Sequence, residues 1–589
     1  MKNNTEIMKI LMLLVLLGYS FNGFGQVTWQ QKIDAEVWAG TNQTTFEYFV
    51  LLKDQVNTSV AKQFSNKTEK AQYVFTQLKN KAQETQGALL QLIQQYQGDY
   101  RPYFIVNGIW VKGNSTLLEV LAKREEVALI APNPRVYNDL PNRPDANTSL
   151  GIARGPRNFE WGIGMIRANL LWNQNLKGAG VVVGGQDTGY EWIHPALRNQ
   201  YRGDTLNHNY HWHDAIHGQI SADTLNKCGY DVNYPCDDAT HGTHTMGTMI
   251  GDDGQGNQIG VAPEATWVGC RSMENGWGTP ATYIECFEWF MAPTDTNNLN
   301  PNPSMAPHVI ANSWGCPTVE GCNPSNFSIM QLVVENLKNS GVFVVVSAGN
   351  DGWLGCHSIM NPAAIYEASF SVGATDILDT LANFSSLGSV TSDGSLRMKP
   401  NVVAPGAGIR SSIPNGGYAA YSGTSMAGPH VAGAVALLIN AKPSLAGNVD
   451  SLETLLEMTA DTVYTYRDDT CGTTTQLVFP NNMVGYGRIN LYKALQVIRP
   501  DLVTSTTKVI TQDVRIYPNP SSGIIQVQTS TAMEACQVTI TSALGQVVRQ
   551  FDTYFNTILE MDLGNISTGV YIITIENENQ KVVGKMIKS

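Results

Sequence analysis

Charged residues are scarce in this chain. They make up 15% of its 589 residues, whereas an average globular chain carries roughly 25%. Disordered tail proteins need more charge and fewer aromatic residues, so the composition excludes that class. Basic residues are in the minority, with 38 Lys and Arg against 50 Asp and Glu. The resulting formal charge of −12 argues against a broad surface for nucleic acid or anionic membranes.

Long apolar runs are absent after the N-terminal segment. Lys2 and Lys9 precede an apolar run at 10–17, and a Gly-Phe-Gly segment follows at 23–25. A positive start, a short apolar core and small residues before the cut are typical of a secretory signal peptide. The run is shorter than the ~20 residues that span a bilayer, which disfavours the alternative of a membrane anchor. We therefore predict a signal peptide over 1–25 and an exported protein.

Paired CxxC motifs are absent too, which disfavours a structural zinc site. Cysteines of exported proteins commonly form disulfides. Cys228 and Cys236, and likewise Cys316 and Cys322, are spaced to close small loops. Sequence alone does not pair the other five cysteines. Because the total of nine is odd, at least one thiol is free or paired between chains.

Residues 27–140 have the pattern of a small α+β unit. A long helix carries an amphipathic stripe that ends near Tyr96, and a short helix is expected around Thr116. Alternating strands and helices in a segment of this length indicate a split βαβ module. Residues 138–157 are rich in Asn, Asp, Pro and Gly and have no periodicity, so a linker is expected there. The expected strands are 46–51, 103–111 and 127–130.

Residues 158–498 carry a different pattern, with continuous apolar runs at 181–183, 309–311 and 342–346. Strands of this kind are buried on both faces, which indicates a parallel sheet between two helical layers in an α/β domain. Catalytic groups in such a sheet usually lie at the carboxyl ends of the strands.

The last segment, 514–589, has short alternating strands separated by Gly, Asn and Ser turns, which predicts a small all-β sandwich. Residues 499–513 hold several Thr residues and Pro500 without apolar periodicity. We expect a linker there and few contacts across it.

Three polar residues stand at the ends of these features. Asp187 follows the strand at 181–183, His241 lies among small residues, and Ser425 precedes a helical pattern. Taken singly, each has a structural explanation: a turn former, a core residue and a helix cap. A helix N-terminus also favours developing negative charge, so Ser425 has a position suited to chemistry.

The order Asp, His, Ser, each within a motif of small residues, resembles that of the subtilisin-like serine proteases. Four segments carry this resemblance: Gln-Asp-Thr-Gly at 186–189, His-Gly-Thr-His at 241–244, Ser-Ala-Gly-Asn at 347–350 and Gly-Thr-Ser-Met-Ala-Gly-Pro-His at 423–430. The resemblance implies a subtilisin-like three-layer fold and a secreted serine endopeptidase.

The resemblance also assigns roles. Ser425 would be the nucleophile, which needs a base within hydrogen-bond reach. His241 would take and return the proton, and Asp187 would orient the imidazole. Asn350 would bind the oxyanion with the backbone N–H of Ser425. His244 is expected to be structural.

The same resemblance implies a cleft that pairs with an extended peptide. No cofactor is expected, and a structural calcium, common in the family, is left open without named ligands because no EF-hand-like loop appears. His208, His211, His213 and His217 form a tract that suggests zinc, but their aromatic and polar neighbours favour a packed loop, so no metal site is predicted. The expected substrate-binding residues are Ser313, Trp314, Gly315, Ala348 and Gly349.

The two flanking units have resemblances of their own. Residues 104–111 and 121–124 resemble the inhibitory propeptides of subtilases, in the manner of the bacillopeptidase F group, which implies an intramolecular inhibitor and a zymogen. Tyr-Pro-Asn-Pro at 517–520 and Gly-Val-Tyr at 569–571 resemble the type IX secretion sorting domain. This implies the type IX machinery as a partner and a secreted or cell-surface location. The alternative is an adhesive or carbohydrate-binding sandwich.

Two other functions compete with a subtilisin-like protease. A catalytically silent surface-binding protein would keep the fold, but it would not need all four of Asp187, His241, Asn350 and Ser425. A sedolisin-type enzyme uses a glutamate base, which the full histidine motif at 241–244 disfavours.

Overall fold

The computed structural model describes most of the chain after residue 27. The expected signal peptide 1–25 and most of the expected linker 138–157 lie outside the described residues. Among the described residues, none of the helices is both long and apolar enough to cross a bilayer. The described residues are 28–138, 140, 159–221, 226–463, 465, 471–472, 478–502, 510–512, 514–543, 546–577 and 580–589.

The central region, as described, contains a seven-stranded sheet in which every neighbouring pair is parallel. The sheet confirms the predicted α/β class. In order across the sheet the strands are β13 (Val402–Pro405), β12 (Phe370–Thr375), β11 (Phe343–Ser347), β10 (Val309–Asn312), β6 (Val182–Asp187), β8 (Thr266–Arg271) and β7 (Trp212–Asp214).

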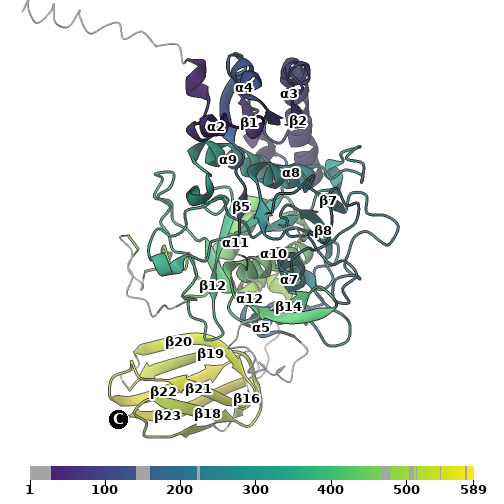
Figure 1. The fold of residues 1–589 in the computed structure, drawn as a ribbon. Helices are drawn as coiled ribbons and strands as arrows, with labels where there is room; N and C mark the ends of the chain where they lie inside the picture. Colours follow the sequence, from purple (N-terminus) through teal and green to yellow (C-terminus); the bar gives the residue numbers. More distant parts are fainter. Residues whose placement is uncertain are drawn as a thin grey trace, which may run out of the picture.

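Helices cover both faces of this sheet (Figure 1). Along β11, Phe343 and Val345 belong to the core shared with α10 (Thr424–Ala441), while Val344 and Val346 belong to the core on the other face. This alternation explains why the predicted strands are continuous apolar runs. The first face also carries α6 (Ala168–Trp172), α7 (His241–Ile250), α11 (Val449–Met458) and α12 (Leu491–Ile498), and the second carries α8 (Pro280–Met291) and α9 (Pro324–Asn339).

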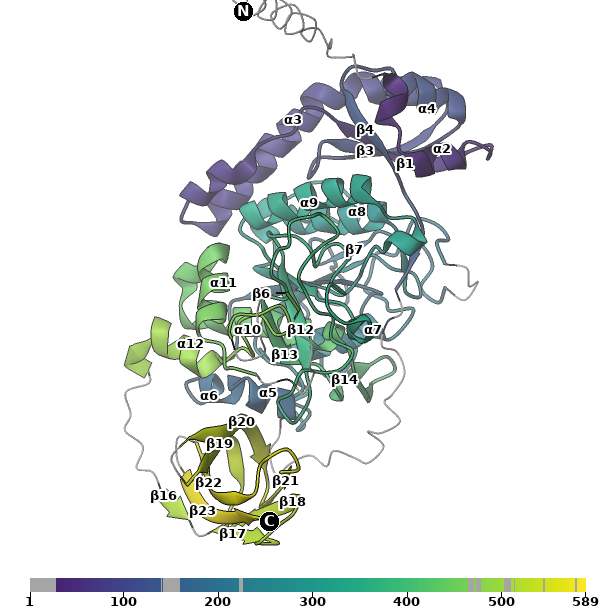
Figure 2. The same cartoon turned by 90° about the vertical axis from the view of Figure 1, so that its left-hand side faces the viewer.

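The N-terminal unit lies on α8 and α9 (Figures 1 and 2). Its antiparallel sheet has the order β2-β3-β1-β4, with one helix inserted on each side of β2-β3, as a split βαβ module requires. The elements are α2 (Ala35–Gly40), β1 (Phe46–Leu52), α3 (Lys67–Gln95), β2 (Asp99–Tyr103), β3 (Gly108–Gly113), α4 (Ser115–Ala122), β4 (Val127–Pro132) and β5 (Val136–Tyr137).

One strand prediction for this unit is wrong. The expected single strand 103–111 is a hairpin, because the chain reverses between β2 and β3. The backbone N–H groups of Phe104 and Ile105 donate to the Glu288 carboxylate on α8, at 2.5 and 2.8 Å. Apolar residues of the turn are therefore buried against the central region rather than in a strand ladder.

The C-terminal segment forms two sheets around a core of its own, which confirms the predicted sandwich (Figure 2). Tyr571, Ile573 and Ile575 point into that core, while Val570 is exposed. One sheet has the order β17 (Val514–Tyr517), β18 (Ile524–Thr529), β21 (Ile558–Asp562). The other has the order β16 (Ile510–Gln512), β23 (Gln580–Lys588), β22 (Gly569–Glu576), β19 (Met533–Ser542), β20 (Val547–Phe555).

The boundary of this sandwich differs from the expected one in two ways. Strand β16 pairs with β23, so part of the expected linker 499–513 belongs to the sandwich. Contacts also cross the boundary, since Arg488 of the central region donates to Asp552 on β20 at 2.5 Å. The expectation of few contacts is therefore wrong.

Four disulfides cross-link residues of the central region. Two of them, Cys228–Cys236 and Cys316–Cys322, are those predicted from spacing. The other two, Cys270–Cys286 and Cys356–Cys471, join residues 16 and 115 positions apart, and such pairings cannot be assigned from sequence. The ninth cysteine, Cys536, is buried in the sandwich as a thiol.

Candidate active site

The four candidate catalytic residues lie where strands end and helices begin. Asp187 is the last residue of β6, and His241 is the first residue of α7. Ser425 is the second residue of α10, and Asn350 follows the end of β11. Helices α7 and α10 pack against each other. The fold therefore brings the four segments to one edge of the sheet.

Asp187 and His241 form a buried pair. The imidazole Nδ1 lies 2.8 Å from Oδ1 and 2.9 Å from Oδ2 of the carboxylate. Thr188 and Thr245 donate to the same two oxygens. Since an ionised carboxylate only accepts, Nδ1 carries a proton, and in the neutral form of the imidazole the lone pair is then on Nε2. Nε2 is buried and has no hydrogen-bond partner among the described residues.

Ser425 lies in the first turn of α10, where backbone N–H groups have no intrahelical acceptor. Asn350 is tied to this turn through Thr424. Its Oδ1 accepts from the backbone N–H of Thr424 at 2.9 Å and from the Thr424 hydroxyl at 3.0 Å. The oxygen of the Asn350 side chain is thereby occupied by Thr424, and its –NH₂ group can only donate.

The five candidate substrate-binding residues occupy two neighbouring strand ends. Ser313 and Ser347 share a hydrogen bond of 3.1 Å between their hydroxyls. The indole of Trp314 is buried and stacks on Tyr283, with ring centroids 4.0 Å apart. Ala348 is buried, and its N–H donates to a backbone carbonyl of β12. The N–H of Gly349 donates to the hydroxyl of the residue before Ser425, at 3.2 Å.

Gly315 already has a partner from the N-terminal part of the chain. Its backbone N–H donates to Oδ1 of Asn138 at 2.6 Å. The preceding strand β5 pairs antiparallel with β9 (Trp277–Gly278), and the Asn138 N–H donates to Gly276. The segment 136–138 therefore lies extended between β9 and Gly315. Sequence reasoning missed β9; its one signal was the turn-forming Asn-Gly pair before Trp277.

The histidine tract does not gather into one site. His213 and His217 each place Nε2 2.9 Å from Oε1 of Glu285 on α8, whereas His208 pairs with the Tyr201 hydroxyl. Burial, together with Arg202, lowers the pKa of His211 to about 4. In the described part of the chain, no group of three or more His, Cys, Asp or Glu side chains is placed to hold a metal.

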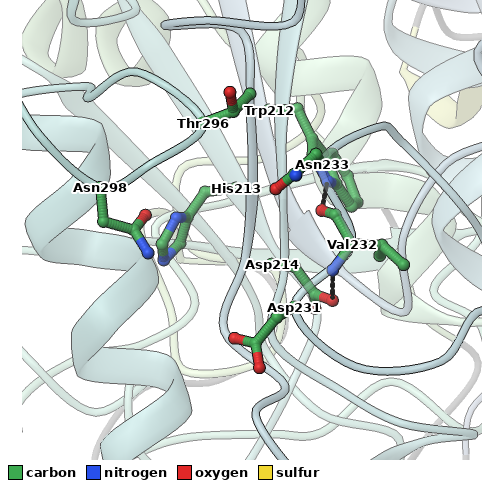
Figure 3. A pocket seen from close by; sticks show the side chains of 8 residues that line it. All are labelled: Trp212, His213, Asp214, Asp231, Val232, Asn233, Thr296 and Asn298. Atoms are coloured by element: carbon green, nitrogen blue, oxygen red, sulfur yellow. Dashed lines mark hydrogen bonds between the residues drawn. The ribbon is translucent and has the colours of Figure 1, made fainter.

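A small polar cavity of about 70 Å³ lies beside this tract (Figure 3). Figure 3 shows Val232 bridging its wall: the N–H of Val232 donates to Asp214, and its carbonyl accepts from the Trp212 indole. None of the four candidate catalytic residues lines this cavity. The lining residues are Trp212, His213, Asp214, Asp231, Val232, Asn233, Thr296 and Asn298.

His244 is buried on the same helix as His241. It stacks on Tyr421, with ring centroids 4.4 Å apart, and its Nε2 lies within 3.1 Å of the carbonyls of Ile409 and Ala419. Burial and the neighbouring His241 lower the pKa of His244 to about 3. These contacts agree with the structural position expected of it.

An all-parallel sheet between two helical layers, with Asp, His and Ser at one edge, defines the subtilisin-like class of α/β proteins. The chain belongs to the subtilase family, whose sequence profile matches residues 178–487. The profile of the secretion system C-terminal sorting domain matches residues 515–589, which assigns the chain to secretion or the cell surface.

Several curated proteins are similar to this chain. Bacillopeptidase F of Bacillus subtilis is 35% identical over 453 residues, which cover 74% of this chain and 29% of that protein. Subtilisin NAT of Bacillus subtilis subsp. natto is 31% identical over 285 residues, which cover 48% of this chain and 62% of that protein. Subtilisin of Bacillus pumilus is 31% identical over 285 residues and is covered over 86% of its length. The chain thus spans less than two thirds of the first two relatives.

Proposed function

We propose that this protein is a secreted serine endopeptidase that is made as a self-inhibited zymogen. The observation that carries the proposal is the buried Asp187–His241 pair, which leaves Nε2 of His241 without a partner among the described residues. A base at the N-terminus of α7, beside the helix that carries Ser425 in its first turn, is the arrangement that acyl transfer needs.

The proposed reaction starts with attack of Ser425 Oγ on the scissile carbonyl carbon. His241 Nε2 takes the hydroxyl proton and then gives it to the leaving amine as the C–N bond breaks. Asp187 keeps the imidazole oriented and stabilises its cationic form. Water then attacks the acyl-enzyme ester with the same base, which releases the acid and restores Ser425.

The oxyanion of each tetrahedral intermediate would lie at the start of α10. There the Ser425 N–H and the amide –NH₂ of Asn350 are both available as donors, and the helix dipole favours negative charge. Because the Thr424 contacts hold the Asn350 amide in place before substrate binds, little reorganisation is needed when the charge develops.

Substrates would bind as an extended strand between β9 and residues 313–315, with Ala348 and Gly349 at the adjoining strand end. The segment 136–138 pairs with β9 and bonds to Gly315, which supports a product-like, inhibitory arrangement of the N-terminal unit 27–140. The unit is further anchored by Arg101, which pairs with Glu285. After removal of this unit, the groove would be open to peptide substrates.

Labelling by a fluorophosphonate probe tests the proposed activity. The mature protein should be labelled, and Ser425→Ala should abolish the label. Ser444→Ala, at an exposed serine distant in sequence from the motif, should leave it intact. Absence of labelling in the mature wild-type protein would favour the alternative of a silent binding protein that keeps the fold.

A further inference from the structure

A buried ion cluster joins the sorting domain to the catalytic region. Arg488 forms a β-bridge with Val403 of β13, shortly before α12, and is fully buried. Its guanidinium contacts Asp379 and donates to Oδ2 of Asp461 at 2.6 Å and to Oδ2 of Asp552 at 2.5 Å. Asp379 and Asp461 belong to the catalytic region, whereas Asp552 is on β20 of the sorting domain.

A second arginine holds the same tail carboxylate. Arg167, just before α6, lies 3.4 Å from Oδ2 of Asp552 through one nitrogen and donates to the carbonyl of Ala535 on β19 through another, at 2.6 Å. Asp552 is 5% exposed. Two arginines from distant parts of the catalytic region thus converge on one buried carboxylate of the sorting domain.

The sorting domain supplies one of the carboxylates of this cluster. Lys493 on α12 pairs with Asp461 at 2.5 Å, so three cations face the three carboxylates. Without Asp552, Arg167 would lose this carboxylate partner and Arg488 would lose one of three. Removal of one member of a buried charge set is costly because the remaining charge is left unpaired.

Apolar contacts surround the ion cluster. Strands β19 and β20 pack on α5 (Trp161–Met165), and Tyr554 contacts the small core that contains Trp161 and Met426. Helix α5 in turn lies directly on α10, because a Cβ at Gly162 would stand 2.5 Å from Nε2 of His430. In Figures 1 and 2, β20 is the part of the sandwich that faces α5.

We propose that the catalytic region carries a docking surface for its own sorting domain, in which Arg167 and Arg488 clamp Asp552. The surface combines a buried cluster of paired charges with an apolar contact, as expected of a specific interface rather than a flexible tether. Cleavage of the connecting segment alone does not release the sorting domain. Release requires the clamp to open as well.

The test uses the full chain in a Ser425→Ala background, with the recognition site of a specific protease inserted between residues 503 and 509. After complete cleavage, size-exclusion chromatography at micromolar concentration should show the two fragments eluting together. Asp552→Asn should separate them, since loss of one partner of a buried charge pair weakens binding by about 10²-fold or more. Glu560→Gln, at an exposed position of β21, is the matched control and should leave them together.

Arg167→Gln is a second variant. It removes the charge of one of the two arginines that contact Asp552 and leaves the sequence of the sandwich unchanged. It should also separate the fragments. Circular dichroism and thermal melting of each cut product check that both parts remain folded. Separation of the wild-type fragments, or co-elution of both clamp variants with wild-type affinity, would overturn the proposal.

Discussion

The side-chain oxygen of Asn350 accepts two hydrogen bonds from Thr424, one from its backbone N–H and one from its hydroxyl. This relationship links the end of β11 to the first turn of α10. Because the oxygen of the Asn350 amide is already occupied, its –NH₂ group is the part that is left to donate. Because Ser425 follows Thr424, the same contacts tie the Asn350 side chain to the turn that carries the proposed nucleophile.

We therefore expect Asn350→Ala to lower kcat with little change in KM. The amide acts on a charge that develops only in the transition state, so its loss leaves substrate binding nearly unchanged. By analogy with a subtilisin, in which the corresponding loss was measured, the decrease should be about 10²–10³ in kcat. Steady-state kinetics on a peptide substrate measure it, with exposed Asn297→Ala as the control. A loss confined to KM would contradict this role.

Self-processing should depend on Ser425. The segment 136–138 pairs with β9 and bonds to Gly315, so the cut is expected in the stretch from Asn138 to Arg157, between two compact units. A purified Ser425→Ala chain should remain at the length left by signal removal, while the wild type shortens with time. Gel analysis and mass spectrometry of the products measure this.

Addition of active enzyme is the control for this experiment. The Ser425→Ala chain should be cut when the mature enzyme is supplied, which shows that its linker is still accessible. Maturation of the inactive chain at the normal rate, when purified alone, would contradict self-processing.

The sequence predicted those parts of the fold whose signals are local. The apolar runs at 181–183, 309–311 and 342–346 became β6, β10 and β11, because burial on both faces leaves a continuous pattern in the sequence itself. The candidate site residues follow such strands or begin helices, so their placement on one edge could also be anticipated.

The missed features depend on partners that are distant in the chain. The turn at Phe104 has the composition of a strand, but its N–H groups bond to Glu288, far along the sequence. Strand β9 is two residues long and pairs with a segment about 140 positions earlier. Asp552 looks like an ordinary surface residue of a strand. Nothing near it in the sequence indicates that it pairs with Arg488. Long-range pairing of this kind leaves no local periodicity.

Stability should fall in acid partly through His430. Its Nδ1 lies 2.9 Å from the carbonyl of Met426, and burial lowers its pKa to about 4. An unfolded histidine takes up a proton near pH ~6.5, whereas His430 in the folded chain does not. Its contribution to stability is therefore complete above pH ~6.5 and is lost progressively as the pH falls toward about 4.

The difference between the wild type and His430→Gln isolates this effect from other titrating groups. The gap in the free energy of unfolding should shrink by about 1.4 kcal/mol per pH unit below ~6.5 and stay constant above it. Urea unfolding in a Ser425→Ala background measures the gap. A gap that does not change between about pH 7 and about pH 5 would show that His430 is protonated in the folded state as readily as in the unfolded state.

Deletion of residues 503–589 should separate export from catalysis. The proposed catalytic residues all lie within 178–487, so the shortened enzyme should keep activity within a few-fold of the wild type. The sorting domain is removed, so the enzyme should stay in the periplasm instead of reaching the medium or the cell surface. Its melting temperature should fall, because Arg488 loses Asp552 as a partner.

Fusion of residues 510–589 to an inert reporter tests whether the sorting domain alone is sufficient for export. The fused segment begins at β16, since that strand pairs with β23 and belongs to the sandwich. The reporter should be exported in cells with a working type IX machinery and retained in cells without it. Cell fractionation and immunoblotting measure the distribution of the shortened enzyme and of the reporter. Export of the shortened enzyme would show that the export signal lies outside residues 503–589. Loss of its activity would show that the catalytic region needs the sorting domain for its structure.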